Sequence, residues 1–286
     1  MSELAIIGDL HSVWNDDDVR YFNGTEYELL LFTGDLGGGL TRDSLAIARS
    51  LSSLKRSALV MLGNNDAPEY AAIAAELTYQ RGLAGLMSKG EGEASTPSTR
   101  TCGFSAHPLD LSGLRATLIA CRPFAMGGNE LSFPAELCER YSVASLDSSR
   151  DRLRALVDGA DTEHLVFLAH NGPTGLGTTA SDPWGRDFGG KTGDWGDRDL
   201  ADAVAYARER GRRPLAVIAG HMHWSDARPR RWCVEQHGTL YVNAACVPRV
   251  LEADGAQRRV HLALTLSPAG ARVRLVKVPS ERDSRQ

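Results

Sequence analysis

Residue types that bind metal ions recur at five points of the sequence, each directly after a short apolar run. The five segments are Asp9-Leu10-His11, Gly34-Asp35, Gly63-Asn64, His170 and Gly220-His221-Met222-His223. Carboxylate, imidazole and amide oxygen are borderline-to-hard ligands that suit Mn, Fe or Zn. Each segment alone is weak, since a single Asp after a strand usually caps a turn. Together they favour a metal site built at several strand ends, where an open α/β sheet binds its ligands.

The apolar runs before these segments predict buried β-strands. They cover residues 4–7, 29–32, 58–62, 165–169 and 215–219. Continuous apolar runs of this length are typical of strands covered on both faces by other layers. Segments with helical features separate them, at residues 41–54, 69–77, 149–157 and 199–210. The alternation of strands and helices favours an α/β architecture.

Three regions interrupt this alternation. Residues 88–98 form a polar loop rich in Gly, Ser and Pro. Residues 99–124 predict a hairpin in which Arg100–Phe104 pairs with Ala116–Cys121 across a turn near Ser112-Gly113. Further strands are expected over residues 239–278, with a turn at 268–270, and residues 281–286 are expected to fray. Since no repeat or linker is evident, residues 1–286 are expected to form a single domain.

Composition and charge narrow the class of protein. The 286 residues are 42% hydrophobic and carry a formal net charge of −4, as in ordinary soluble proteins. This charge gives no general attraction to nucleic acids or membranes, so we expect a small phosphorylated substrate rather than a nucleic acid polymer. No apolar run approaches the ~20 residues that span a bilayer. The first predicted strand starts too early for a signal peptide, so we expect a cytoplasmic location. The oligomeric state stays open.

The five cysteines are few and scattered. They are Cys102, Cys121, Cys138, Cys233 and Cys246. An odd number without a C-x-x-C spacing argues against a disulfide framework and against a thiolate zinc site. We therefore expect them to be small buried hydrophobic residues in a reducing compartment.

In the order of its motifs, the chain resembles the calcineurin-like metallophosphoesterase superfamily. That superfamily carries D-x-H, G-D, G-N-H-D/E, a single His and G-H-x-H in sequence. Within residues 5–225 the corresponding segments are Asp9-Leu10-His11, Gly34-Asp35, Gly63-Asn64-Asn65-Asp66, His170 and Gly220-His221-Met222-His223. Residues 122–131 and 170–177 also resemble a bacterial and plant-type subgroup. The resemblance implies an α/β fold, a four-layer αββα sandwich of two mixed β-sheets flanked by helices.

The resemblance also implies a dinuclear metal centre. By motif matching, one ion would take Asp9, His11, Asp35 and His223, and the other Asp35, Asn64, His170 and His221. The shared Asp35 would reduce the repulsion between two cations ~3.5–4 Å apart. The expected reaction is attack of a metal-bridging hydroxide on a phosphodiester or phosphoanhydride of a small molecule, such as a nucleotide derivative. Mn is the first candidate metal, with Fe and Zn as alternatives.

One position departs from the superfamily pattern. Asn65 stands where G-N-H-D/E has a histidine that contacts the phosphate and helps the leaving group depart. An amide can bind a phosphate oxygen but cannot protonate an alkoxide, and general acid catalysis contributes ~10²–10⁴-fold. We therefore expect a preference for stable leaving groups, such as aryl, nucleotide and pyrophosphate groups. Asp66 or His107 could supply the missing proton, and the alternative interpretation makes Asn65 a plain turn residue.

Residues 171–199 form a long insertion rich in glycine, aspartate and aromatic residues, and such loops are usually functional or disordered. The residues that could contact a substrate are Trp184, Phe188 and Trp195 by stacking, and Arg186 and Lys191 by charge. The equally weighted alternative is that the aromatic residues only fix the loop to the body of the protein.

Several other residues have two interpretations. Arg122 could reach the phosphate, although a structural ion pair is the favoured interpretation. Met222 is expected to face the core, because neighbouring extended residues point in opposite directions. The arginines at 228, 230 and 231 could attract anionic substrates but are expected to form a solvated loop.

Two other functions stay open. The first is a phosphomonoesterase or protein phosphatase, against which Asn65 argues. The second is a non-catalytic protein-binding scaffold with the same fold. A scaffold is expected to show eroded metal ligands, whereas all seven positions here carry a competent side chain. Metal content of the purified protein separates the two classes.

Overall fold

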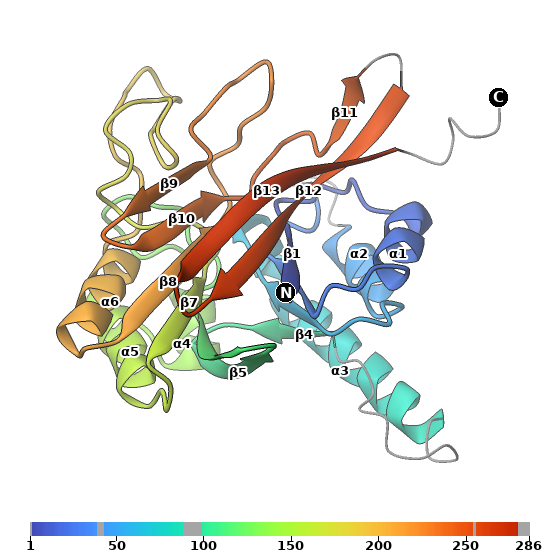
Figure 1. Ribbon diagram of the computed structural model, residues 1–286, viewed down its shortest axis with the longest axis horizontal. Helices are drawn as coiled ribbons and strands as arrows, with labels where there is room; N and C mark the ends of the chain where they lie inside the picture. The colour runs from blue at the N-terminus through green and yellow to red at the C-terminus, as the bar shows by residue number, and fades with distance from the viewer. Residues whose placement is uncertain (1, 39–42, 88–98, 254–255, 280–286) are drawn as a thin grey trace.

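Two β-sheets face each other, and helices lie on their outer sides (Figure 1). The computed structural model describes residues 2–38, 43–87, 99–253 and 256–279. The first sheet has the strand order β11-β12-β1-β2-β3-β4, with β13 paired to β12, and the second has the order β5-β6-β7-β8-β10-β9. Both sheets combine parallel and antiparallel pairs. The expected α/β sandwich of two mixed sheets is confirmed.

The five predicted strands are present within two residues of their expected ends. The strands of the first sheet are β1 (Glu3–Ile7), β2 (Leu29–Phe32), β3 (Ala58–Met61), β4 (Thr99–Cys102), β11 (Val250–Ala253), β12 (Ala256–Ser267) and β13 (Gly270–Pro279). Those of the second are β5 (Ser105–Leu111), β6 (Leu114–Ala120), β7 (His164–Leu168), β8 (Arg213–Ala219), β9 (Cys233–Gln236) and β10 (Thr239–Asn243).

Helices α1 to α3 lie on one side of the sheets and α4 to α6 on the other (Figure 1). Their bounds are α1 (Asp16–Asn23), α2 (Ser44–Leu51), α3 (Tyr70–Met87), α4 (Pro134–Tyr141), α5 (Leu146–Asp158) and α6 (Arg198–Glu209), with a short 3-10 helix η1 (Asn64–Glu69) before α3. No helix in the described ranges has both the length and the apolar character of a membrane span.

Alternating side chains along the strands divide the core into two parts. In β1, Leu4 and Ile6 belong to the apolar cluster formed by strands of both sheets. Ala5 and Ile7 belong to a second cluster that includes helix residues such as Leu51. Both faces of the strand are therefore buried, which explains why its sequence is continuously apolar rather than alternating.

The predicted hairpin over residues 99–124 is wrong in one strand. Residues Thr99–Cys102 form β4, which runs parallel to β3 in the first sheet. The strand that pairs with β6 is β5, and the turn between them lies at Ser112-Gly113 as expected. The chain crosses between the sheets at Gly103-Phe104. Because only two residues separate β4 and β5, the hydrophobicity pattern did not show that they are two separate strands.

The other sequence expectations outside the site have mixed outcomes. The turn at 268–270 is confirmed by the pairing of Ser267 with Gly270. Cys102, Cys121 and Cys246 are buried, whereas Cys138 is exposed and Cys233 is half-buried, so burial was a wrong expectation for these two. The predicted loop at 88–98 and the predicted tail at 281–286 lie outside the described residues.

Candidate metal centre

All seven predicted metal ligands follow the carboxyl ends of five strands, six of them in loops and Asn64 at the start of η1. The first sheet carries Asp9 and His11 after β1, Asp35 after β2 and Asn64 after β3, and the second carries His170 after β7 and His221 and His223 after β8. The two sheets pack with these ends together, so side chains far apart in the sequence meet at one edge of the sandwich.

A first group of donors surrounds Asp9. The ligand atoms of Asp9, His11, Asp35 and His223 all lie within 4.8 Å of one another. The Nε2 atoms of His11 and His223 are 2.9 Å apart. His223 Nε2 lies 3.5 Å from Asp9 Oδ2, and His11 Nε2 lies 3.8 Å from Asp35 Oδ2. These are the four residues predicted to hold one ion.

A second group of donors shares Asp35 with the first. Ligand atoms of Asp35, His170 and His221 lie within 4.8 Å of one another. His170 Nε2 is 2.9 Å from Asn64 Oδ1 and 3.5 Å from Asp35 Oδ1. One oxygen of Asp35 therefore faces His170 while the other faces His11. A carboxylate placed in this way can bridge two cations.

Backbone carbonyls orient the histidine rings. His170 Nδ1 lies 2.7 Å from the carbonyl oxygen of Thr33, and a hydrogen bond donated there leaves Nε2 without a proton. The amide nitrogen of Asn64 donates to Asn65 Oδ1, so Asn64 Oδ1 faces His170 Nε2. Two acceptors thus point at the same space, and a cation satisfies both. This donor set fits a divalent metal ion.

The charges of the cluster also fit a cation. Burial raises the pKa of Asp35 well above its usual range, and the negative charges of Asp9 and Asp66 raise it further. Burial, together with the charge of His170, lowers the pKa of His221 to about 3, so the neutral ring can bind a metal ion. Crowded carboxylates beside neutral imidazoles are the arrangement that a bound divalent cation stabilises.

Two glycines allow the ligand loops to approach closely. A Cβ atom on Gly63 would lie 2.2 Å from Asp35 Oδ1, and one on Gly220 would lie 2.1 Å from Asp9 Oδ1. The glycines in the G-N and G-H motifs are therefore explained by space at the carboxylates rather than by turn formation alone.

Asn65 and Asp66 occupy different environments. The backbone N–H and the amide nitrogen of Asn65 donate to the two oxygens of Asp35 at 2.9 and 3.0 Å. The fully buried Asp66 accepts hydrogen bonds from the N–H groups of Gly63 and Leu36 and from the Ser44 hydroxyl. Asn65 therefore holds the shared carboxylate, and Asp66 connects three segments behind the site. Their catalytic roles stay predictions.

Other candidates lie outside the donor cluster. His107 is on β5, hydrogen-bonded to Ser105 and Arg100. Arg122 is buried and pairs with two carboxylates, which confirms the structural interpretation of this residue; the partners are Asp197 at 2.7 Å and Asp199 at 2.8 Å. Met222 is buried in the core as expected.

Buried side chains fix the loop after His170 to the site. The sequence alone did not show which of them contact substrate and which are structural. Trp184 is fully buried and donates from Nε1 to the carbonyl of Gly220 at 3.2 Å, so it cannot stack on a substrate. Arg230 is also buried and contacts the carbonyl of His223, so the expectation of a solvated arginine loop is wrong there. Phe188 stays exposed.

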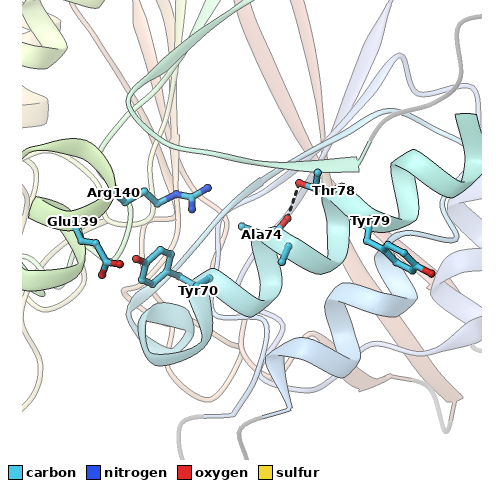
Figure 2. A pocket seen from close by; sticks show the side chains of 8 residues that line it. Tyr70, Ala74, Thr78, Tyr79, Glu139 and Arg140 are labelled. Atoms are coloured by element: carbon cyan, nitrogen blue, oxygen red, sulfur yellow. Dashed lines mark hydrogen bonds between the residues drawn. The ribbon is translucent and has the colours of Figure 1, made fainter.

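A separate hollow of about 700 Å³ lies along α3 and α4 (Figure 2). Its lining residues are Tyr70, Ala71, Ala74, Ala75, Thr78, Tyr79, Glu139 and Arg140. None of them is a predicted ligand, so the chemistry does not centre on this hollow.

The fold and donor cluster define a metal-binding protein of the metallophosphoesterase class. A model of the calcineurin-like phosphoesterase family matches residues 3–225, and the chain belongs to that family. No curated protein matches the sequence.

Solved structures share the fold at low sequence identity. One crystal structure aligns with a TM-score of 0.57 at 13% identity, covering 96% of this chain and 98% of its own, which shows the fold alone. Vacuolar Protein Sorting 29 from Cryptosporidium parvum aligns over 98% of both chains at 11% identity with a TM-score of 0.32. Vps29 from Chaetomium thermophilum aligns at 12% identity with a TM-score of 0.26, covering 98% of this chain and 96% of its own. These two scores are too low to support a functional argument.

Proposed function

We propose that the protein hydrolyses a phosphodiester or phosphoanhydride of a small molecule with the help of two divalent metal ions. The observation that carries this proposal is the position of Asp35, whose two oxygens face two separate groups of donors. Two cations held there would activate water and neutralise the phosphate. Mn is the first candidate, and the same donors accept Fe or Zn.

The residues around this carboxylate favour substrates with stable leaving groups. Asn65 has no acidic proton at neutral pH, and its amide nitrogen is already hydrogen-bonded to Asp35. Asp66 is committed to hydrogen bonds with Gly63, Leu36 and Ser44. A leaving group that needs no protonation suits such a site, and aryl, nucleotide and pyrophosphate groups meet this condition.

The test compares hydrolysis of bis-p-nitrophenyl phosphate with that of p-nitrophenyl phosphate in added Mn²⁺. We expect the diester to be the better substrate, and we expect Asp35→Asn to abolish its hydrolysis. Asp202→Asn is the matched control, because it also removes one negative charge. Asp202 lies on α6 and pairs with Arg154, outside the donor cluster. Bound metal is measured in each preparation.

The other outcomes identify the competing functions. A preference for the monoester would mean that another residue supplies the proton, as in a phosphomonoesterase or protein phosphatase. A folded protein that binds no metal and hydrolyses neither compound would overturn the proposal in favour of a protein-binding scaffold.

A further inference from the structure

Arg186 lies in a segment that the Arg230 side chain links to the backbone of His223, a predicted metal ligand. Arg230 donates from Nε to the carbonyl of His223 at 3.3 Å. The same guanidinium donates to the carbonyl of Gly185 at 2.7 Å and to the Asp187 carboxylate at 2.9 Å. Both chain neighbours of Arg186 are therefore fixed to the side chain that contacts a predicted metal ligand.

A second connection reaches the cluster through Trp195, whose ring contacts Arg186. Gly128 lies against this ring, since an added Cβ atom would be 3.3 Å from it. Asn171, the residue after the predicted ligand His170, donates from its amide nitrogen to the carbonyl of Trp195 at 3.0 Å. Arg186 is thus connected to the predicted ligands by two independent sets of contacts.

Two aromatic rings hold the guanidinium of Arg186. Its Cζ lies 4.7 Å from the centre of the Phe188 ring and 4.5 Å from that of Trp195. The rings are perpendicular to each other, with centres 5.2 Å apart, and Arg186 Nε donates to the carbonyl of Phe188 at 3.1 Å. A guanidinium fixed in this way loses little conformational entropy when it binds an anion.

The positive charge of Arg186 is not neutralised within the described part of the chain. No carboxylate there lies within 4 Å of it, whereas the buried Arg122 and Arg230 each have an acidic partner. Arg186 therefore carries a preorganised guanidinium without an acidic partner among the residues described, in a segment connected to the predicted metal site. Arginine is well suited to bind the oxygens of a phosphate in pairs.

We propose that Arg186 binds a second phosphate group of the substrate, which makes the substrate a phosphoanhydride. This inference rests on the proposed hydrolase function and narrows its substrate class. It also agrees with Asn65: water adds its oxygen to one phosphorus, the bridging P–O bond breaks, and the second phosphate departs with the electron pair. The departing phosphate is stable as an anion, so the proton of water passes to solvent without a general acid.

Kinetics with two substrates test this role. Diadenosine diphosphate contains a phosphoanhydride, whereas bis-p-nitrophenyl phosphate contains one phosphorus. We expect Arg186→Gln to lower kcat/KM for diadenosine diphosphate by roughly 10- to 100-fold, the usual effect of losing a hydrogen bond to a charged group. Hydrolysis of bis-p-nitrophenyl phosphate should change little. Arg186→Lys should restore part of the loss, because it keeps the charge but not the planar fork.

Arg228→Gln is the matched control. Arg228 is exposed in a neighbouring loop, so this variant removes the same charge without removing the held guanidinium. Similar losses in both variants would show a general electrostatic effect and would overturn the assignment to Arg186. Equal losses on both substrates in Arg186→Gln would overturn it as well.

Binding provides a readout that does not depend on turnover. Calorimetric titration compares the α,β-methylene analogue of ADP with AMP, which lacks the second phosphate. We expect the wild-type protein to prefer the diphosphonate and Arg186→Gln to lose most of that preference. If the wild type hydrolyses neither substrate, the hydrolase proposal fails, and the titration still decides whether Arg186 recognises a second phosphate. An unchanged preference in Arg186→Gln would refute this recognition.

Discussion

Asn65 occupies the position where the family pattern has a histidine, and its side-chain amide donates a hydrogen bond to Asp35. We predict that Asn65→His raises kcat for an alkyl monoester such as phosphoserine by 10-fold or more, since an imidazole can protonate the departing alkoxide. Hydrolysis of bis-p-nitrophenyl phosphate should improve less, because nitrophenolate needs no proton. Steady-state kinetics on both substrates provide the measurement, with Asn65→Gln as the control. Equal changes on both substrates would contradict the prediction.

His261 gives a pH prediction outside the donor cluster. Burial, together with the charges of Arg249 and Arg274, lowers its pKa to about 3. In the unfolded chain the imidazole takes up a proton below pH 6.5, but the folded state keeps it neutral beside the Tyr27 hydroxyl, 2.9 Å away. The free energy of unfolding should therefore fall between pH 6.5 and pH 3, by about 2 kcal/mol at pH 5.

Urea denaturation of the wild type and His261→Gln at pH 7 and pH 5 checks this prediction. Glutamine keeps a polar side chain but does not titrate, so other ionisable groups cancel in the comparison. The stability difference between the two proteins should shrink at pH 5. Parallel pH dependence in both would rule out His261 as the cause.

At the level of single residues, the sequence predicts ligand types better than their surroundings. Asp9, His11 and Asp35 could be chosen because each follows a buried strand, and the structure brings all three together. The hydrogen bond between His170 and the backbone carbonyl of Thr33 could not be foreseen, since any residue offers a carbonyl. Backbone partners leave no signal in side-chain identity.

The loop between β7 and α6 depends on one anchor. Trp184 fills a fully buried position, and a Cβ on Gly172 would lie 1.9 Å from its ring. We predict that Trp184→Ala releases this loop, lowers stability by about 3 kcal/mol and weakens metal retention, because its hydrogen bond to Gly220 is lost next to His221. Limited proteolysis and metal analysis provide the measurements.

Phe188→Ala is the control for this variant, since it removes an exposed ring from the same loop. It should leave proteolysis and bound metal nearly unchanged. If the two variants behave alike, Trp184 is not the anchor.

Among the secondary-structure elements, the strands with continuous apolar runs were predicted from the sequence, whereas helix α1 was missed. Helix α1 begins after Asn15, whose side chain accepts from Asp17 N–H while Asp18 bonds back to the backbone of Asn15. This capping box was present in the sequence and could have revealed the helix. Strand β4 was assigned to the wrong sheet because sheet membership depends on tertiary pairing, not on local pattern.

At the scale of the whole molecule, the two sheets each contribute ligands to one centre, so metal binding should stabilise both. We predict that removing metal with EDTA lowers the thermal midpoint by several degrees and that added Mn²⁺ restores it. At metal concentrations 1,000 times the Kd, the stabilisation amounts to about 4 kcal/mol. Thermal denaturation of the wild type and Asp35→Asn measures this effect. A shift of equal size in the variant would show that the metal acts elsewhere.

The pairing of β1 with β12 has a consequence for how the chain acquires its structure. Glu3 pairs with Thr265, and β1 lies between β2 and β12 in the first sheet. During synthesis the N-terminal strand leaves the ribosome more than 250 residues before its partner, with one edge open to other chains. Closing so long a loop is slow. A chain interrupted after residue 225 would keep all the predicted ligands but would leave β1 unpaired on that side, so we expect it to need chaperones or to aggregate.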